Sequence, residues 1–235
     1  MSFKSLVRKS LAPLMPSLDP DAYKKRLAGK TPAEIFTTIY EKKLWGGRLS
    51  LGFQSGNGSR DSKVVEPYIA AVRKLLTELN HPSVLDLGCG DFQVSRHLVH
   101  YANPLIACDI VAPVIKANRR KYPGVDFRII DAIEDELPNA DVVLIRQVLQ
   151  HLSNEQISKI LPKLTKFKLA VITEHVSSGD FIANRDKLGG PEDRAIHGSG
   201  IVLDKPPFNF RAADYRTICE VHEWGGIIQT NVLVF

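Results

Sequence analysis

The sequence predicts a doubly wound α/β fold with a mostly parallel sheet, a C-terminal antiparallel hairpin and a helical N-terminal extension. Strand and helix patterns alternate from His81 onward. The predicted strands are short continuous apolar runs, which is typical of parallel strands covered on both faces. The end of the chain differs, because Thr217–Val221 and Ile227–Phe235 flank Trp224-Gly225-Gly226 and read as two strands joined by a tight turn.

Length and composition are those of an ordinary globular protein. With 235 residues, the chain is long enough for one large core, or one core and a small appendage. No apolar run reaches the roughly 18 residues that a membrane-spanning helix needs, and no secretory signal is evident. The three cysteines are widely spaced and odd in number, which indicates a reduced compartment and no disulfide framework. We therefore expect a cytoplasmic protein.

The positive charge is concentrated near the start of the chain. Residues 1–60 hold eleven Lys and Arg against four acids, a net +7, so the remainder carries −2 of the total +5. We expect residues 1–60 to form a basic helical extension or lid, and residues 61–235 to form a Rossmann-like domain. A basic lid suits an anionic substrate, a nucleic acid or an acidic membrane surface, although a solvated basic face is an equally good interpretation.

The extension has three recognisable elements. Apolar residues at helical spacing over residues 3–11 predict a short amphipathic helix, which the prolines at 13, 16 and 20 end. The sequence Thr31-Pro32-Ala33-Glu34 predicts a capped helix start, and this helix should run to about Lys43. The loop Ser55-Gly56-Asn57-Gly58-Ser59 follows, and an apolar stripe then predicts a helix over 61–79.

The alternating region gives the main elements of the sheet domain. Apolar runs predict strands over 83–87, 105–109, 126–130, 141–145 and 169–173. Helical periodicity between the strands predicts helices over 92–101, 114–121 and 154–164.

The strongest functional motif is the turn after the first of these strands. Val84-Leu85-Asp86-Leu87 runs directly into Gly88-Cys89-Gly90, where a Cβ would collide with a ligand lying across the strand ends or would demand an unfavourable φ. Asp109 ends the next strand about twenty residues later, where a carboxylate can accept both hydroxyls of an adenosine ribose. Asp131 ends the third strand, where it can meet an adenine amino group, with Ala132 beside the ring. The alternative is that these acids only cap the helices that follow.

Taken together, VLDLGCG, the acid after the second strand, the Asp131-Ala132 pair and the closing hairpin resemble the class I S-adenosylmethionine-dependent methyltransferases. The resemblance covers roughly residues 60–235. It implies a seven-stranded sheet whose last strand is antiparallel, and S-adenosyl-L-methionine as the cofactor. It also implies site residues: Asp86 near the methionine amino group, Gly88 and Gly90 against the cofactor backbone, Asp109 on the ribose, Asp131 and Ala132 at the adenine, and Arg146 and Gln147 at the methionine and methyl side.

One position departs from that family. Phe92 stands where the family often has a third glycine, and we expect its ring to line the pocket, with altered packing of the helix there. A nicotinamide cofactor is disfavoured, because the turn reads DLGCGDF and lacks the GxGxxG spacing.

The upstream glycine-rich loop is a second candidate for the cofactor site. Backbone amides around Ser55 and Gly56 can meet the methionine carboxylate or a substrate anion. The chain also resembles, more loosely, bacterial methyltransferases that have a tryptophan-containing helix and an SGxGS loop before the sheet, some of them associated with glycans or secondary metabolites. The alternative is a flexible linker that binds no ligand.

Two histidines are candidates for a general base. His151 follows the fourth strand and His175 follows the fifth, so both should lie at the crevice where an acceptor must sit. A hydroxyl acceptor needs a base, and the ordinary pKa of histidine lies near working pH. The alternative for each is a histidine whose nitrogens are satisfied by the backbone.

The acceptor pocket is expected to lie between the N-terminal extension and a long insertion over 176–214, since loops of this length in a compact domain are usually functional. Glu174, Arg194 and His197 are the expected substrate contacts. No metal-ligand spacing is recognisable among the His, Cys, Asp and Glu residues, so the reaction is expected to be metal-independent.

These observations favour O-methylation of a small molecule or a sugar or glycan, with an anionic acceptor as one option. Two alternatives stay open. One is RNA methylation, for which the pI of about 9.1 is the main support. The other is a regulatory protein that binds S-adenosylmethionine without catalysis.

Overall fold

A computed structural model describes residues 20–46 and 52–235. The amphipathic helix predicted over residues 3–11 lies outside these ranges. The helices are α2 (Pro20–Leu27), α3 (Pro32–Glu41), α4 (Ser62–Glu78), α5 (Ala112–Lys121) and α6 (Asn154–Leu164). The strands are β1 (Val84–Leu87), β2 (Leu105–Asp109), β3 (Asp126–Ile129), β4 (Val142–Arg146), β5 (Leu169–Ser177), β6 (Ile182–Ala183), β7 (Ser199–Gly200), β8 (Asp214–Glu223) and β9 (Gly226–Val234).

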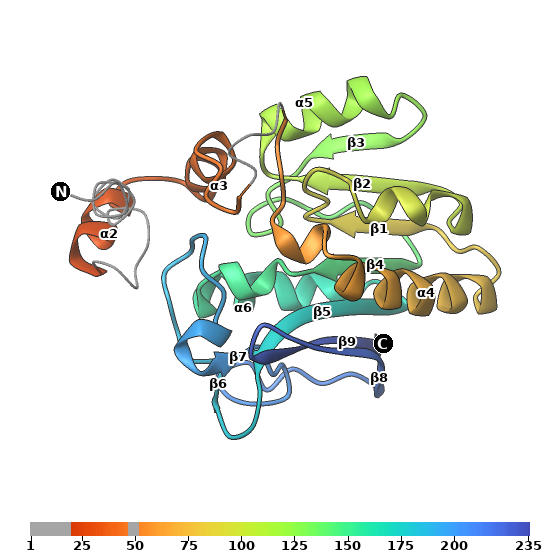
Figure 1. Ribbon diagram of the computed structural model, residues 1–235. Coiled ribbons are helices and arrows are strands. Elements are labelled where there is room, and N and C mark those ends of the chain that lie inside the picture. Colours follow the sequence, from red (N-terminus) through yellow and green to blue (C-terminus); the bar gives the residue numbers. More distant parts are fainter. Residues whose placement is uncertain (1–19, 47–51) are drawn as a thin grey trace.

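Seven of the strands form one sheet in the order β3-β2-β1-β4-β5-β9-β8. The first five are parallel, β9 runs antiparallel to β5, and β8 closes the sheet as an antiparallel hairpin with β9 (Figure 1). This arrangement confirms the predicted α/β fold of the class I methyltransferase type. The strand order reverses between β1 and β4, so a crevice opens at the carboxyl end of β1, where ligands of doubly wound sheets bind.

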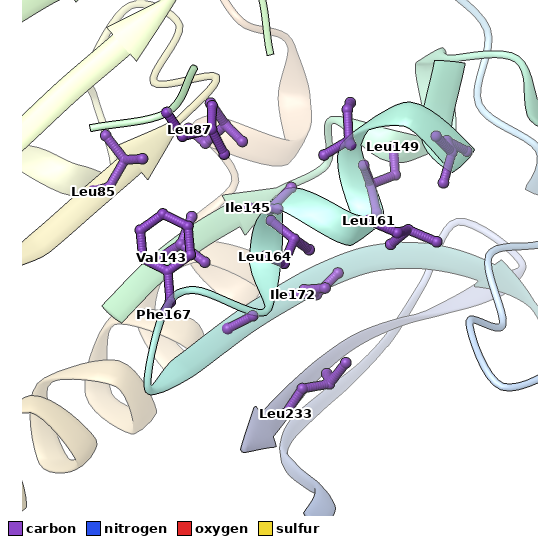
Figure 2. Packing of buried hydrophobic residues seen from close by; sticks show 14 of the residues in the cluster. Leu85, Leu87, Val143, Ile145, Leu149, Leu161, Leu164, Phe167, Ile172 and Leu233 are labelled. Atoms are coloured by element: carbon purple, nitrogen blue, oxygen red, sulfur yellow. The ribbon is translucent and has the colours of Figure 1, made fainter. Parts of the chain in front are cut away.

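Each face of the sheet carries its own core, because successive side chains of a strand point to opposite faces. On one face Leu85, Val143 and Ile145 pack with α6 residues such as Leu161 and Leu164 (Figure 2). The other face is covered by α4, whose apolar stripe packs on Val84, Val142, Leu144 and Val171. With both faces covered, β1, β2 and β4 are buried along almost their whole length, which explains their continuous apolar sequences.

Helix starts follow the local sequence closely. Thr31 and Glu34 form the predicted capping box, with the Glu34 N–H donating to the Thr31 hydroxyl and the Thr31 N–H donating to the Glu34 carboxylate. Ser153 and Gln156 form a second capping box that starts α6. Both α2 and α3 lie beyond the carboxyl ends of the parallel strands (Figure 1).

Two predicted elements need correction. The helix predicted over 92–101 is wrong: that segment contains two short 3-10 turns, Ser95–His97 and Val99–Tyr101. Phe92 has a φ of +60°, which no α-helix tolerates, and its ring is buried against Tyr122 and Phe127 and does not line the crevice. The fifth strand runs on to Ser177, so His175 lies within β5 and not after it.

Helix α2 and the small β6–β7 pair had no sequence prediction. The domain boundary near residue 60 stays a prediction.

Within 20–46 and 52–235, no helix has the length and apolar character needed to cross a bilayer.

Candidate active site

One cavity of about 290 Å³ lies over the carboxyl ends of β1, β2 and β4. Its walls come from the glycine turn after β1, the loops after β2 and β3, the segment after β4, and helix α3 with the Ser55–Ser59 loop. The residues predicted to bind the cofactor are all among its lining: Ser55, Gly56, Asp86, Gly88, Gly90, Asp109, Asp131, Ala132, Arg146 and Gln147. The two candidate bases, His151 and His175, line it as well.

The glycine turn is fixed by protein contacts as well as by the space it leaves for a ligand. Gly88 and Gly90 have φ values of +80° and +51°, where side chains are unfavourable. A Cβ on Gly88 would lie 2.4 Å from Val148 Cγ2, and one on Gly90 would lie 2.2 Å from Ser55 Oγ. The glycines therefore also allow two other segments to approach β1 closely, which the sequence alone did not indicate.

Asp109 holds this turn from the neighbouring strand. Its Oδ2 accepts the Gly90 N–H at 3.0 Å, and its Oδ1 accepts the Val111 N–H at 2.9 Å. Burial raises the pKa of Asp109, while these amide hydrogen bonds act in the opposite direction. Asp131 lies two residues beyond the end of β3, and its Oδ1 accepts the Ile133 N–H at 2.8 Å.

Asp86 is the buried carboxyl group at the base of the cavity. Its Oδ2 has no hydrogen-bond partner in the described part of the chain, and burial raises its pKa to about 7. Nearby Asp109 raises this pKa further, whereas a hydrogen bond with Ser95 and the charge of Arg146 lower it. An unsatisfied buried carboxyl is costly in a folded protein, so this atom fits a ligand that brings a positive donor such as an ammonium group.

The Ser55–Ser59 loop is anchored on both sides of the cavity. Ser55 Oγ accepts the Asp91 N–H and shares a hydrogen bond with the Tyr40 hydroxyl, both at 2.9 Å. Arg146 donates to the Gly58 carbonyl at 2.6 Å and lies over the Tyr68 ring, 4.9 Å from its centroid. These contacts tie the loop to both the glycine turn and the end of β4.

Aromatic side chains of α3 and its C-terminal end close the cavity on the side away from the sheet. Phe36, Tyr40 and Trp45 all line it, and the Trp45 ring lies 5.0 Å from that of His151. Trp45 Nε1 also donates to the Pro191 carbonyl at 2.8 Å, which joins α3 to the 176–214 insertion. The i, i+4 spacing of Phe36 and Tyr40 on a predicted helix was the available indication of this wall.

The two candidate histidines have different environments. Both nitrogens of His151 have partners: Nδ1 lies 3.2 Å from the Gly190 carbonyl and Nε2 lies 3.3 Å from Gln150 Nε2. Burial, aided by the charge of Lys187, lowers the pKa of His151 to about 4, so the ring is neutral at neutral pH. His175 is only 4% exposed, its Nδ1 lies 2.9 Å from Asp193 Oδ2, and its Nε2 has no hydrogen-bond partner among the described residues.

The structure corrects the three expected substrate contacts, none of which lines the cavity. Glu174 is buried within β5 and accepts the N–H groups of Val148, Leu149 and Gln150 at 3.3, 2.9 and 3.0 Å. Alternation along a strand explains this, because Glu174 points to the face opposite His175.

Arg194 and His197 are structural parts of the insertion. Arg194 is 1% exposed and donates to the carbonyls of Leu152 and Arg185. His197 Nε2 lies 3.2 Å from Glu192 Oε2. Asp193, which sequence reasoning did not single out, is the charged residue that the insertion contributes to the cavity lining. Nothing in its local sequence distinguishes it from the neighbouring acids.

Two buried acids should make the free energy of unfolding depend on pH. Burial raises the pKa of Asp86 from 3.8 to about 7 and that of Glu174 from 4.5 to about 8. Between these values the folded state binds more protons than the unfolded state, so stability should fall as pH rises through this window. Urea unfolding of the ligand-free protein at pH 5, 6, 7 and 8 measures the effect. A free energy of unfolding that rises steadily from pH 5 to 8 would contradict it.

Comparison with known proteins agrees with the geometry. Residues 84–167 match the family model described as a methyltransferase domain. This match, together with the strand order and the glycine turn, agrees with the resemblance to class I S-adenosylmethionine-dependent methyltransferases that the sequence motifs carry. Residues 84–167 therefore form part of a methyltransferase domain. No curated protein sequence matches the chain.

Several solved structures have the same fold. The N-methyltransferase NodS from Bradyrhizobium japonicum, in complex with S-adenosyl-L-homocysteine, has a TM-score of 0.58 at 11% identity over 85% of this chain and 98% of its own. The human N-acetylserotonin methyltransferase with bound S-adenosylmethionine has a TM-score of 0.56 at 16% identity, covering 88% and 60%. Magnesium protoporphyrin IX methyltransferase from Synechocystis PCC 6803 has a TM-score of 0.55 at 16% identity, covering 88% and 99%.

Proposed function

We propose that this methyltransferase transfers the methyl group of S-adenosylmethionine to a hydroxyl group of a small molecule or sugar, without a metal ion. The observation that carries this proposal is that one cavity is lined both by the glycine turn with Asp86 and Asp109 and by the two histidines. A donor placed over the glycine turn and an acceptor placed against the histidines would meet within that cavity.

The donor site is proposed residue by residue. Asp86 would receive the methionine ammonium, which supplies the partner that its Oδ2 lacks. The backbone at Gly88 and Gly90 would lie along the donor, Asp109 would accept the ribose hydroxyls, and Asp131 with Ala132 would flank the adenine. The methionine and methyl side would be bordered by Ser55, Gly56, Arg146 and Gln147.

The sulfonium supplies an already activated methyl group, so the protein's task is to position the acceptor, exclude water and remove a proton. His151 and His175 are the candidates for the last role; the His151 ring lies beside Trp45 and the His175 ring beside Trp224. Small-molecule acceptors of both oxygen and nitrogen type fit this fold, since NodS is an N-methyltransferase by its printed name. An amine that is protonated in water must lose its proton before it can attack the methyl group, because only the neutral amine has a free lone pair. A hydroxyl group has lone pairs already and needs a base to take its proton.

Calorimetry with S-adenosylhomocysteine tests the donor site, and methyl transfer in the presence of EDTA tests the chemistry. We expect saturable binding and a turnover rate that EDTA leaves within twofold, because within residues 20–46 and 52–235 no three His, Cys, Asp or Glu side chains form a metal-binding group. A rate that EDTA abolishes and added divalent metal restores would contradict the metal-independent reaction.

The same experiments separate the alternatives. Donor binding without transfer to any acceptor would favour a regulatory protein. Binding of RNA that weakens steeply as salt rises would favour an RNA substrate.

A further inference from the structure

We propose that the outer surface formed by α5, the two 3-10 turns before β2 and the C-terminal half of α4 docks on an anionic membrane surface. We call it the basic surface, and its six cations are Arg73, Arg96, Lys116, Arg119, Arg120 and Lys121. The inference goes beyond the proposed function and does not rest on it, because none of these side chains lines the cavity.

The charge of this part of the domain has one sign. Residues 92–125 hold five Lys or Arg and one acid, Asp109, which is buried at the end of β2. The remaining residues of 61–235 hold 15 Lys and Arg against 21 acids, so the negative charge of the domain lies outside this segment. Ordinary surfaces mix both signs, whereas a field of one sign attracts an oppositely charged partner.

The cations of the basic surface are not neutralised by the protein. None of the six forms an ion pair in the described part of the chain, and all except the partly exposed Arg73 are exposed. Lys116, Arg119 and Arg120 have i, i+3, i+4 spacing, so they lie on one face of α5. Arg119 donates to the Phe127 carbonyl at 3.0 and 2.6 Å, which fixes its guanidinium without cancelling the charge.

The 3-10 turns continue the positive charge from α5 to α4. Arg73 Nε donates to the His97 carbonyl at 3.1 Å, and Arg96 Nε donates to His97 Nε2 at 3.2 Å. Burial and the charges of Arg96 and Arg73 lower the pKa of His97. Two guanidinium groups therefore meet at one imidazole with no acid paired to either, and an anion placed over them would relieve their repulsion.

The acids of the flanking elements do not interrupt this surface. Glu78 on α4 is paired with Lys74 at 3.9 Å, and Asp126 on β3 is paired with Arg128 at 2.6 Å. By strand alternation, the Asp126–Arg128 pair points to the face of β3 opposite Phe127, which packs under α5. Ile129 shares the side of Phe127 and is 51% exposed, so an apolar side chain lies at the edge of the basic surface.

The aromatic rings of the surface favour a membrane over a nucleic acid. The Arg73 guanidinium lies 5.1 Å from the centroid of the Tyr101 ring, and the His81 ring stacks on Tyr101 with centroids 6.1 Å apart. Lys121 Nζ likewise lies 5.1 Å from the centroid of Tyr122. These rings are already covered, so they offer no platform on which bases could stack. A layer of anionic headgroups needs only cations spread over a face, each of which adds to the attraction.

Co-sedimentation of the full chain with lipid vesicles tests the inference. Phosphatidylcholine vesicles that contain about 30% phosphatidylglycerol should bind the protein, and vesicles of phosphatidylcholine alone should not. Raising the salt from roughly 0.1 M to 0.5 M should weaken the binding at least tenfold, because salt screens exposed charges. Absence of binding to the anionic vesicles, or equal binding to both kinds of vesicle, would overturn the inference.

A triple substitution assigns the binding to this surface. Lys116→Gln/Arg120→Gln/Lys121→Gln should lower the affinity for the anionic vesicles at least tenfold. The control Lys205→Gln/Arg211→Gln/Arg216→Gln removes the same charge near β8, at the opposite edge of the sheet from β3, and should stay within twofold of the wild-type protein. Circular dichroism and the dissociation constant of S-adenosylhomocysteine check that both variants keep the wild-type fold.

The other outcomes each contradict the inference. Unchanged vesicle binding by the basic-surface variant would assign the binding to another part of the chain, such as the basic segment 1–60. Equal losses in the two triple variants would show a general effect of net charge. Binding of an RNA duplex that the basic-surface substitutions abolish, without any vesicle binding, would assign the surface to a nucleic acid.

Discussion

Replacing Glu174 with alanine is expected to lower the melting temperature by roughly 6–12 °C, the shift that corresponds to about 3 kcal/mol in a chain of this size. The carboxyl group accepts the N–H groups of Val148, Leu149 and Gln150, all within the segment that follows β4. Alanine would leave these amides without that acceptor, and leaving a buried polar group unpaired costs about 1–3 kcal/mol. Thermal unfolding followed by circular dichroism measures the effect.

A matched control separates this cost from a general effect of removing an acid. Glu136 is exposed, so Glu136→Ala should leave the melting temperature within about 1 °C, as expected for a surface substitution away from special features. Glu174→Gln should be milder than Glu174→Ala, because its amide oxygen can still accept from the backbone. A melting temperature for Glu174→Ala equal to that of Glu136→Ala would show that the three amides find other partners.

Asp109→Ala is expected to weaken the binding of S-adenosylhomocysteine by roughly 5- to 150-fold, the equivalent of about 1–3 kcal/mol. Two losses combine: the proposed acceptor for the ribose hydroxyls disappears, and the Gly90 and Val111 amides lose the groups that fix the glycine turn. Isothermal titration calorimetry measures the dissociation constant.

The two losses can be told apart with a second substitution. Asp109→Asn keeps one carbonyl oxygen for a backbone amide but cannot accept two hydroxyls as a carboxylate does, so it should bind the ligand weakly while retaining more thermal stability than Asp109→Ala. Asp126→Ala, on the adjacent strand and paired at the surface with Arg128, should bind normally. Unchanged affinity in Asp109→Ala would remove this residue from the proposed donor site.

The donor end of the cavity was predictable because its residues sit at strand ends. A buried parallel strand reads as an apolar run, and the residue that follows it must lie at the carboxyl edge of the sheet. Gly88 follows β1 and Asp109 ends β2, so sequence spacing placed both at this edge, whereas Asp86 lies within β1 and its role was implied by the family resemblance. The closing hairpin around Trp224 was also predictable from its sequence, whereas the seven-stranded sheet was implied by the family resemblance.

The acceptor end depends on contacts between segments that are distant in sequence. Asp193 becomes significant only because the insertion folds back on β5, and no local pattern reports that. Arg194 and Glu174 were expected at the cavity because they are charged and close in sequence to it, but the direction of each side chain depends on strand length and on the course of a loop. Phe92 was misjudged because only the fold shows its left-handed backbone and its place in the core.

The hydrogen-bonded series from Tyr40 through Ser55 to the Asp91 amide has a thermodynamic consequence. Tyr40 also meets the Trp45 ring edge to face, with centroids 5.1 Å apart, so one continuous set of contacts joins the two halves of the cavity. A donor that tightens these contacts raises the affinity for the acceptor. Bound acceptor must then raise the affinity for the donor by the same factor, since linkage between binding sites is reciprocal. Donor and acceptor affinities measured separately and together would give this heterotropic coupling directly.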